Sequence, residues 1–284
     1  MMARIPINLD KWFHVITDKK VIKLEELDNL IIDEISKTAP NGSVQSTTIE
    51  SVDGEIPEFV TYGSYDLELN TLYRGIDKRD VDAFIFMLNN ILSKRKPYYV
   101  RHSDLPGIKY AVKPTPKIET SRITRNDYEI KITFECYKGY SESYKTVQDM
   151  NLLAGDWQIE GGARFDDDIK YTHNTKTFDI YNGSYDTIDP LLNHYLYVKI
   201  KADAENGLTI KNNTTGDKIE WFEPLTKDDT LEIKGVYPML NGGHAGRYTD
   251  MEFLTLKEGY NSISIYGDKY DEPYSYWDFN FLYR

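Results

Sequence analysis

Nine consecutive residues near the middle of the chain alternate strictly between apolar and polar side chains. From Tyr128 to Cys136 the odd members of the run are Tyr, Ile, Ile, Phe and Cys, and the even members are Glu, Lys, Thr and Glu. Successive side chains on a strand point to opposite faces of a sheet, so this run predicts an antiparallel strand with one buried face. Cys136 falls on the apolar face, where we expect a small core residue and not a reactive thiol.

One stretch has helical periodicity instead. Between Asp77 and Lys94 the apolar residues recur at helical spacing, namely Val81, Phe84, Ile85, Leu88, Ile91 and Leu92. Asp77 or Asp80 is placed to accept the free N–H groups of the first turn, and we expect Pro97 to end the helix. A second alternating run, at 59–69, predicts one more strand.

The second half has no long helical pattern. It contains short strand candidates separated by turn signals such as Asn182-Gly183 and Asn241-Gly242, at spacings typical of a β-sandwich. The expected strands are Phe178–Tyr181, Tyr195–Ala202, Leu208–Lys211, Leu231–Lys234, Phe253–Leu256, Ser262–Tyr266 and Trp277–Leu282. We therefore predict a mainly β protein with one long helix (α+β), divided at about residue 145 into domains 1–145 and 146–284. A polar linker is expected at 141–162.

Charge is distributed unevenly along the chain. Residues 1–145 carry 21 Lys and Arg against 22 Asp and Glu, whereas residues 146–284 carry 13 against 24. Within the first half, residues 25–82 have a balance of −10 and residues 94–125 a balance of +7. The acidic second half is expected to repel nucleic acid, and we predict no membrane association.

These two blocks predict an acidic and a basic flank through which copies associate head to tail into a ring. The candidate acidic residues are Asp66, Glu68, Asp77, Asp80 and Asp82. The candidate basic residues are Lys94, Arg95, Lys96, Arg101, Lys109 and Lys113. One alternative is that both blocks are solvated faces that neutralise each other within one chain. Another is that the basic block binds nucleic acid, with Tyr98, Tyr99 and Tyr110 as stacking platforms.

No enzyme signature survives inspection. The sequence lacks phosphate-binding, metalloprotease, serine-hydrolase and kinase motifs, and no two of its five histidines lie at ligand spacing. We therefore predict no catalytic residue, cofactor or metal. Asp66 and Glu68 lie two residues apart and have the residue types of a glycosidase pair, but the simpler interpretation is two exposed acidic residues on a strand. Trp221 and Trp277 are candidates for a sugar-stacking surface, although aromatic residues also fill sandwich cores.

The order of these elements resembles the distal tail proteins (Dit) of long-tailed phages that infect Gram-positive bacteria. In the first half the similarity runs from the strand containing Gly63, through Leu72–Gly75 and the helix, to the strand that ends Ile132-Thr133-Phe134-Glu135-Cys136. In the second half it is carried by Tyr181–Asp186, Leu208–Gly216 and Leu256–Ile263.

The resemblance implies a structural protein of the virion tail tip, made in the host cytoplasm. Six copies would form a ring that joins the tail tube protein to the tail-associated lysin, tail fibre or tape measure protein and leaves a channel for DNA. The first domain would be a sandwich-like or barrel-like ring domain. The second would be a galectin-like or carbohydrate-module-like sandwich that docks a receptor-binding protein or a host glycan. The main alternative is a carbohydrate-binding adhesion module that recognises cell-wall polymer, and a glycosidase is the third possibility.

Overall fold

The computed structural model describes residues 11–48, 53–149, 162, 168–268, 271 and 273–284. Two compact units make up the chain, residues 1–141 with 284 and residues 142–283. Both are built from antiparallel sheets, and α1 (Lys78–Leu92) is the single α-helix among the described residues, so the predicted fold class is confirmed. No helix in this part of the chain has the length and apolar character that a membrane crossing requires.

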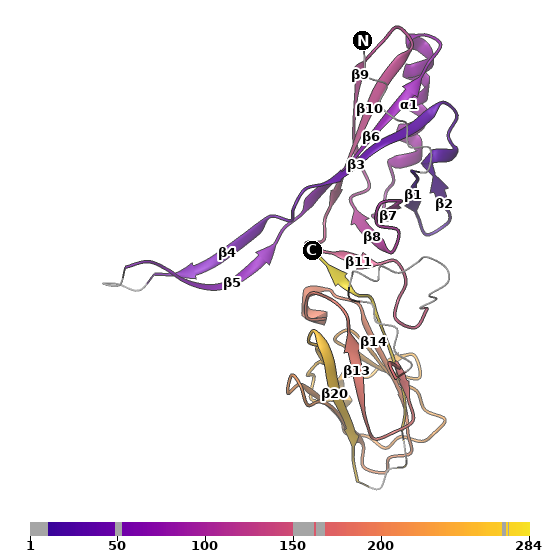
Figure 1. The fold of residues 1–284 in the computed structure, drawn as a ribbon. Coiled ribbons are helices and arrows are strands. Elements are labelled where there is room, and N and C mark those ends of the chain that lie inside the picture. Colours follow the sequence, from indigo (N-terminus) through magenta and orange to yellow (C-terminus); the bar gives the residue numbers. More distant parts are fainter. Residues whose placement is uncertain (1–10, 49–52, 150–161, 163–167, 269–270, 272) are drawn as a thin grey trace. The chain divides into compact units, whose positions relative to one another are not determined.

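The first unit is organised around one long sheet (Figure 1). Its strand order is β2 (Val21–Lys23), β1 (Phe13–Ile16), β7 (Tyr98–His102), β8 (Ile108–Val112), β10 (Asp127–Cys136), β6 (Tyr65–Arg74) and β3 (Leu30–Lys37), with β9 (Lys117–Arg122) paired to β10. The helix lies against this sheet through Val81, Phe84, Leu88 and Leu92, which are buried. The ring of Phe84 stacks on Tyr73 of β6 at 4.0 Å between centroids.

The alternating run forms the predicted strand. β10 pairs with β6 along its whole length, from Asp127 opposite Arg74 to Cys136 opposite Tyr65. Ile130, Ile132, Phe134 and Cys136 are fully buried, and their polar neighbours are exposed or half-buried. Burial raises the pKa of the Cys136 thiol to about 12, so the prediction of an unreactive core cysteine is confirmed.

Two sequence boundaries are corrected by the structure. The run at 59–69 is not one strand, because it breaks at Gly63 and Ser64 into β5 (Ile56–Tyr62) and β6, which lie in different sheets. The helix ends at Leu92, well before Pro97, because the chain leaves the helical path after Ser93 and the Lys94 N–H donates to the carbonyl of Pro114 at 2.8 Å.

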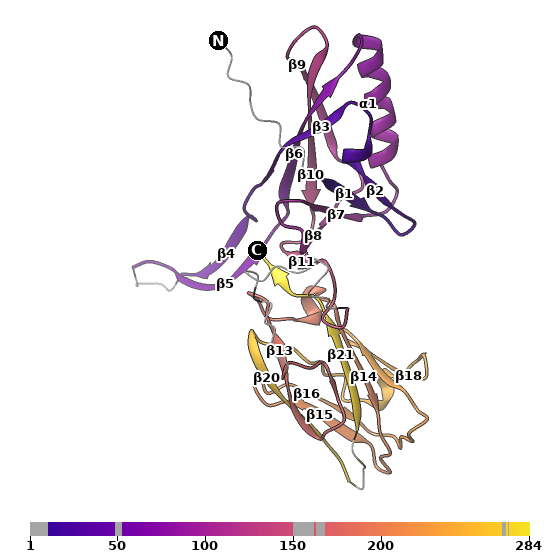
Figure 2. The same ribbon diagram turned by 45° about the vertical axis from the view of Figure 1, so that its right-hand side comes forward.

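A two-stranded hairpin projects from the long sheet of the first unit, as both views show (Figures 1 and 2). It consists of β4 (Gly42–Thr47) and β5 and forms a sheet of its own. We call it the arm. Its register shifts once, between Gln45 and Ser46, where a bulge interrupts the pairing.

The second unit contains two packed sheets (Figure 2). One has the order β12 (Thr172–His173), β21 (Tyr274–Phe279), β14 (Leu196–Lys201), β17 (Leu231–Lys234), β18 (Tyr237–Leu240) and β19 (Gly243–His244). The other has the order β13 (Thr177–Asn182), β20 (Gly259–Tyr266), β15 (Leu208–Asn212) and β16 (Lys218–Trp221). Trp277 of the first sheet meets Phe178 of the second edge to face, with 6.2 Å between ring centroids.

Turn chemistry in this unit follows the sequence signals. Asn241 and Gly242 join β18 to β19 with backbone φ angles of 50° and 81°. Asn and Gly are the residues that adopt this left-handed region most readily, which is why the pair forms a tight hairpin turn.

Two other expectations for the second half are wrong. Phe253–Leu256 is not a strand, since only Leu256 makes an isolated bridge, to Ile188. The beginning of the expected linker is buried: Ser141–Ser143 form strand β11, the Ser143 N–H donates to Phe281 O at 2.8 Å, and Asn280 Nδ2 donates to Ser143 O at 2.9 Å. The rest of the expected linker lies largely outside the described residues.

Candidate assembly surface

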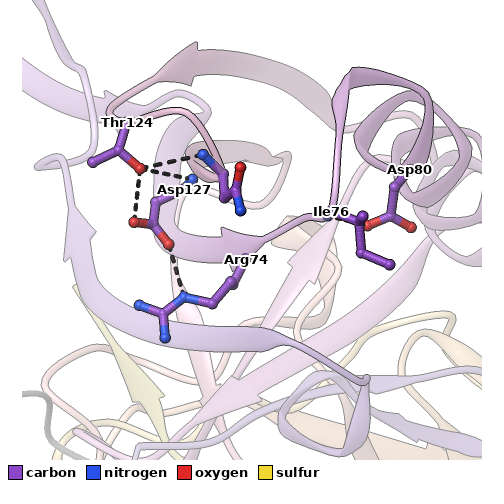
Figure 3. Close-up of polar contacts among 6 residues, drawn as sticks. Arg74, Ile76, Asp80, Thr124 and Asp127 are labelled. Carbon is purple, nitrogen blue, oxygen red and sulfur yellow. Dashed lines mark hydrogen bonds and ion pairs between the residues drawn. The ribbon is translucent and has the colours of Figure 1, made fainter.

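The start of the helix is built by two of the predicted acidic residues. Asp77 is the N-cap, and its Oδ1 accepts from the Asp80 N–H at 3.0 Å. Asp80 turns back toward the preceding loop, where its Oδ2 accepts from the Ile76 N–H at 3.0 Å (Figure 3). The same oxygen accepts from the Tyr73 hydroxyl at 3.2 Å. These carboxylates are therefore engaged in shaping the β6–α1 turn.

A second polar cluster ties β6 to the turn between β9 and β10. Arg74 Nε donates to Asp127 Oδ1 at 2.8 Å, and Thr124 Oγ1 donates to Asp127 Oδ2 at the same distance (Figure 3). Thr124 Oγ1 also accepts from the Asp127 N–H at 3.0 Å. The hydrogen bond from Arg74, followed by that from Thr124, lowers the pKa of Asp127.

The structure divides the predicted acidic flank. Asp66 and Glu68 lie at the beginning of β6, whereas Asp77, Asp80 and Asp82 follow its end. A ten-residue strand separates its ends by roughly 30 Å. Two of these acids also have partners within the chain, since Glu68 pairs with Lys131 at 2.9 Å and Asp82 with Lys78 at 2.8 Å.

The predicted basic residues are likewise spread over several elements. Lys94, Arg95 and Lys96 follow the helix, where Lys94 Nζ donates to Asn90 O at 3.0 Å and Lys96 lies 3.8 Å from an oxygen of Asp18. These three cations occupy the end of the helix that the backbone dipole favours for positive charge.

The remaining basic residues make contacts within their own unit. Arg101 donates to Pro106 O at 2.8 Å and lies 5.0 Å from the centroid of the Trp12 ring. Lys109 lies 5.0 Å from the Tyr99 centroid, and Lys113 pairs with Glu135 at 2.5 Å. Several of the predicted flank charges are thus neutralised within the chain, and their role between copies stays a prediction.

Sequence inspection missed an apolar face on the arm. Val44 and Val60 lie directly opposite each other in the hairpin, with 57% and 45% of their surfaces exposed. Tyr62 lies two residues from Val60, on the same face, and is 41% exposed. Gly42 is opposite Tyr62, and a Cβ there would lie 3.8 Å from the tyrosine ring. Alternation alone did not reveal this face, because the arm is exposed on both sides.

The outer side of the helix is also apolar. Phe86 and Met87 are 72% and 39% exposed and border a groove of about 550 Å³. The other lining residues are Lys20, Ile22, Leu27, Asn90, Ile91 and Lys94. Large exposed apolar side chains that gather on one face are typical of protein–protein contacts.

The two tryptophans do not form a sugar-stacking surface. Trp221 is 2% exposed and Trp277 is fully buried. The Trp277 ring meets Phe178 of the other sheet and the Trp221 ring meets Tyr248, and because both tryptophans are buried, neither offers a face to a sugar. The prediction is wrong because Trp277 shares its side of β21 with Ser275 and Phe279, which are also buried. In the part of the chain that the structure describes, no group of three or more His, Cys, Asp or Glu residues is arranged to hold a metal ion.

Comparison with known proteins finds a family match within the first unit. Residues 17–136 match the family model of the phage tail protein RIFT-related domain. No curated protein sequence matches the chain.

Solved structures extend the likeness to both units. The chain is similar to SPP1 Dit (gp 19.1), described as a paradigm of the hub adsorption apparatus in phages that infect Gram-positive bacteria, with a TM-score of 0.65 and 12% identity. The alignment covers 95% of this chain and 99% of that one. A chain of the phage P2 baseplate in its activated conformation with Ca aligns at a TM-score of 0.44 and 10% identity, over 95% and 98% of the two chains. The family model and the shared fold confirm the resemblance to distal tail proteins drawn from the sequence.

Proposed function

Because residues 17–136 form a phage tail protein domain in a chain with the fold of a distal tail protein, we propose that this protein is the ring-forming hub of a phage tail tip. Copies associate head to tail into a ring, six in number as the resemblance implies. The ring joins the tail tube protein to the lysin, fibre or tape measure protein and leaves a channel through which DNA passes without sequence-specific binding. The first unit forms the ring, and the second faces a receptor-binding protein or the host.

The observation that carries this proposal is the two-way coverage of the structural match. A shared domain within a larger, different protein would leave one of the two chains largely unaligned, whereas 95% of this chain and 99% of SPP1 Dit align. The two units therefore occur together in the same order in both proteins. Such a match supports a shared role for the whole chain and not for one module of it.

The arm supports association between copies. An isolated two-stranded hairpin is at best marginally stable in water, and its outer edges carry unpaired backbone groups. The Val44–Val60 pair adds apolar surface that no described part of the chain covers. Docking of this face on a neighbouring copy would bury both valines and contribute the stability that the hairpin lacks alone.

The helix supports the head-to-tail direction. Asp77, Asp80 and Asp82 lie around its first turns, and Lys94, Arg95 and Lys96 follow its last turn. Lys78 and Arg79 lie in the same first turns and leave that end with a balance of −1, whereas the other end carries three cations. The basic end of one copy can therefore face the weakly acidic end of the next. The divided flanks and the ion pairs within the chain make this electrostatic contribution smaller than the charge blocks alone predict.

The test is the solution mass of the purified chain, measured by light scattering and mass photometry at about 50 mM and about 500 mM salt. Six copies of a 33.0 kDa chain give a particle of about 200 kDa. Partial dissociation at high salt would support the charge contribution, and an unchanged mass would contradict that part of the proposal. A single-chain mass at every concentration would contradict self-assembly into a ring.

Paired arm variants sharpen the test. We expect Val44→Lys with Val60→Lys to reduce the particle to single chains, because two ammonium groups cannot be buried at an apolar contact. The matched control is Ser43→Lys with Thr61→Lys, since Ser43 and Thr61 are also opposite each other but lie on the other face of the arm. If both double variants keep the full mass, the arm does not form the contact.

A further inference from the structure

A groove of about 840 Å³ lies on the outer face of the larger sheet in the second unit, over β14, β17 and β21. Four tyrosines line it, Tyr195, Tyr197, Tyr237 and Tyr276. The strand register places Tyr197 in the middle, with Asp278 on one side and Lys234 on the other. The groove therefore combines aromatic walls with charged groups at fixed positions.

Two of the tyrosine rings are held in place by carboxylates. The Tyr195 hydroxyl donates to Asp278 Oδ2 at 3.1 Å, and the Tyr197 hydroxyl donates to Glu232 Oε1 at 2.6 Å. The Tyr197 ring also meets Tyr276 edge to face, with 6.0 Å between centroids. These hydrogen bonds fix the orientation of the Tyr195 and Tyr197 rings before a ligand arrives. One face of the Tyr197 ring is approached by the Lys234 ammonium group, 5.9 Å from its centroid, which leaves the opposite face for a ligand.

One oxygen of the Asp278 carboxylate receives no hydrogen bond from the described residues. Its side chain lines the groove, the residue is 9% exposed, and Oδ1 is buried without any hydrogen-bond partner among the described residues. A buried polar atom without a partner is destabilising, so such atoms are rare in folded proteins. Tyr195, which donates to the other oxygen of this carboxylate, is 43% exposed, so the carboxylate lies next to the open part of the groove.

The charges around the groove are close to balanced. Glu232 and Asp278 line the groove with Lys234, which lies 3.3 Å from a Glu232 oxygen. Outside the lining, Lys199 has its ammonium group 4.9 Å from the centroid of the Tyr276 ring, and Asp149 acts on the same tyrosine, so these two charges offset each other. Balanced charge gives no net attraction for a strongly charged ligand. It suits an uncharged molecule that brings hydroxyl donors for Asp278 and apolar surface for the tyrosines.

We propose that this groove is a binding site for a neutral saccharide. The C–H face of a sugar ring packs on the flat faces of Tyr197, Tyr237 or Tyr276, and neighbouring sugar hydroxyls donate to the Asp278 carboxylate. A hydrogen bond to an ionised acceptor is stronger than one between neutral groups, so Asp278 sets the position of the ring along the groove. The site differs from the one expected around Trp221 and Trp277, and it is independent of ring formation by the first unit.

The experiment is a binding measurement on the full-length chain. Neutral oligosaccharides (chitotetraose, maltotetraose, cellotetraose and a rhamnose oligomer) are immobilised on an array beside a sialylated oligosaccharide and an arginine-rich peptide, and positive probes are titrated by calorimetry. We expect saturable binding to at least one neutral probe. Tyr237→Ala and Asp278→Asn are each expected to weaken that binding about tenfold or more.

The control is Tyr260→Ala. Tyr260 is 48% exposed on β20, in the other sheet of the same unit, and does not line the groove. This variant should bind like the parent protein, and the far-UV spectra of all three variants should match. No binding to any neutral probe, or binding that the groove variants leave unchanged, would overturn the proposal. Binding of the arginine-rich peptide that depends on Asp278 would instead assign the groove to a protein partner. Because the particle mass is measured separately, none of these results depends on the ring.

Discussion

The carboxylates of the two units are used in different ways. In the first unit, Asp127 lies at the surface with both oxygens bonded, one to Arg74 and one to Thr124 (Figure 3). In the second unit, Asp278 is buried, and only one of its oxygens has a partner. When both oxygens of a carboxylate accept hydrogen bonds within the chain, the group needs no other partner. A buried carboxylate with one unsatisfied oxygen indicates a hydrogen-bond donor from outside the chain.

The largest expected effect is on the free energy of unfolding, and it distinguishes a residue in the interior of the second unit from one that lines its groove. Trp277→Ala should lower the free energy of unfolding by about 3–5 kcal/mol, because it leaves a large cavity between the sheets. Tyr276→Ala, next along the same strand, should change it by less than about 1 kcal/mol, because Tyr276 faces the groove. Denaturant titration followed by circular dichroism measures both. Equal losses would show that the groove face is part of the core.

A buried histidine gives the first unit an acid sensitivity. His102 is 4% exposed, between the rings of Phe13 and Tyr110, and burial lowers its pKa from 6.5 to about 4. The unfolded chain therefore binds a proton that the folded chain does not between these two values. The contribution of His102 to stability should fall by about 3 kcal/mol as the pH is lowered from 6.5 to 4, and this contribution should then level off.

The check is the unfolding free energy at several pH values in this window. His102→Gln should flatten the dependence, because glutamine does not titrate. If His102→Gln keeps the full slope, other groups cause the acid sensitivity.

The smallest effect tests the comparison of the two carboxylates directly. Asp278→Asn should leave the unfolding free energy unchanged or raise it by up to about 1 kcal/mol, since it removes an unpaired buried charge and keeps an acceptor for Tyr195. Asp127→Asn should lower stability slightly at low salt and not at high salt, because an exposed ion pair is screened. A clear loss of stability in Asp278→Asn would mean that the carboxylate is already satisfied within the chain.

The sequence predicted an element of the fold where the residues of that element alone showed its periodicity. β10 follows from alternation alone, and α1 follows from helical spacing and the Asp77 cap. The break between β5 and β6 was not predictable, because the alternation continues through Gly63 and Ser64 although the two strands belong to different sheets.

The sites were less predictable because they depend on which strands become neighbours. Glu68 and Lys131 are 63 positions apart in the sequence, yet the pairing of β6 with β10 brings their charges to 2.9 Å. The groove likewise joins Tyr197 of β14 to Asp278 of β21, and no linear motif links them. The sequence did contain one indication that Trp277 is buried. On the strand, Trp277 shares a face with Ser275 and Phe279, whereas the polar Asp278 lies with Tyr276 on the opposite face.

The arm also has a consequence for the newly made chain. Its two strands form a sheet of their own, so each has an edge on which backbone N–H and C=O groups are open to pairing with any extended chain. The bulge after Gln45 and the missing N–H of Pro57 interrupt these edges and make a continuous ladder with a wrong partner less favourable. Under the proposed assembly these edges stay uncovered until copies meet, so the yield of correct particles should depend on how quickly the copies find one another, and slow assembly at high concentration should lead to precipitation.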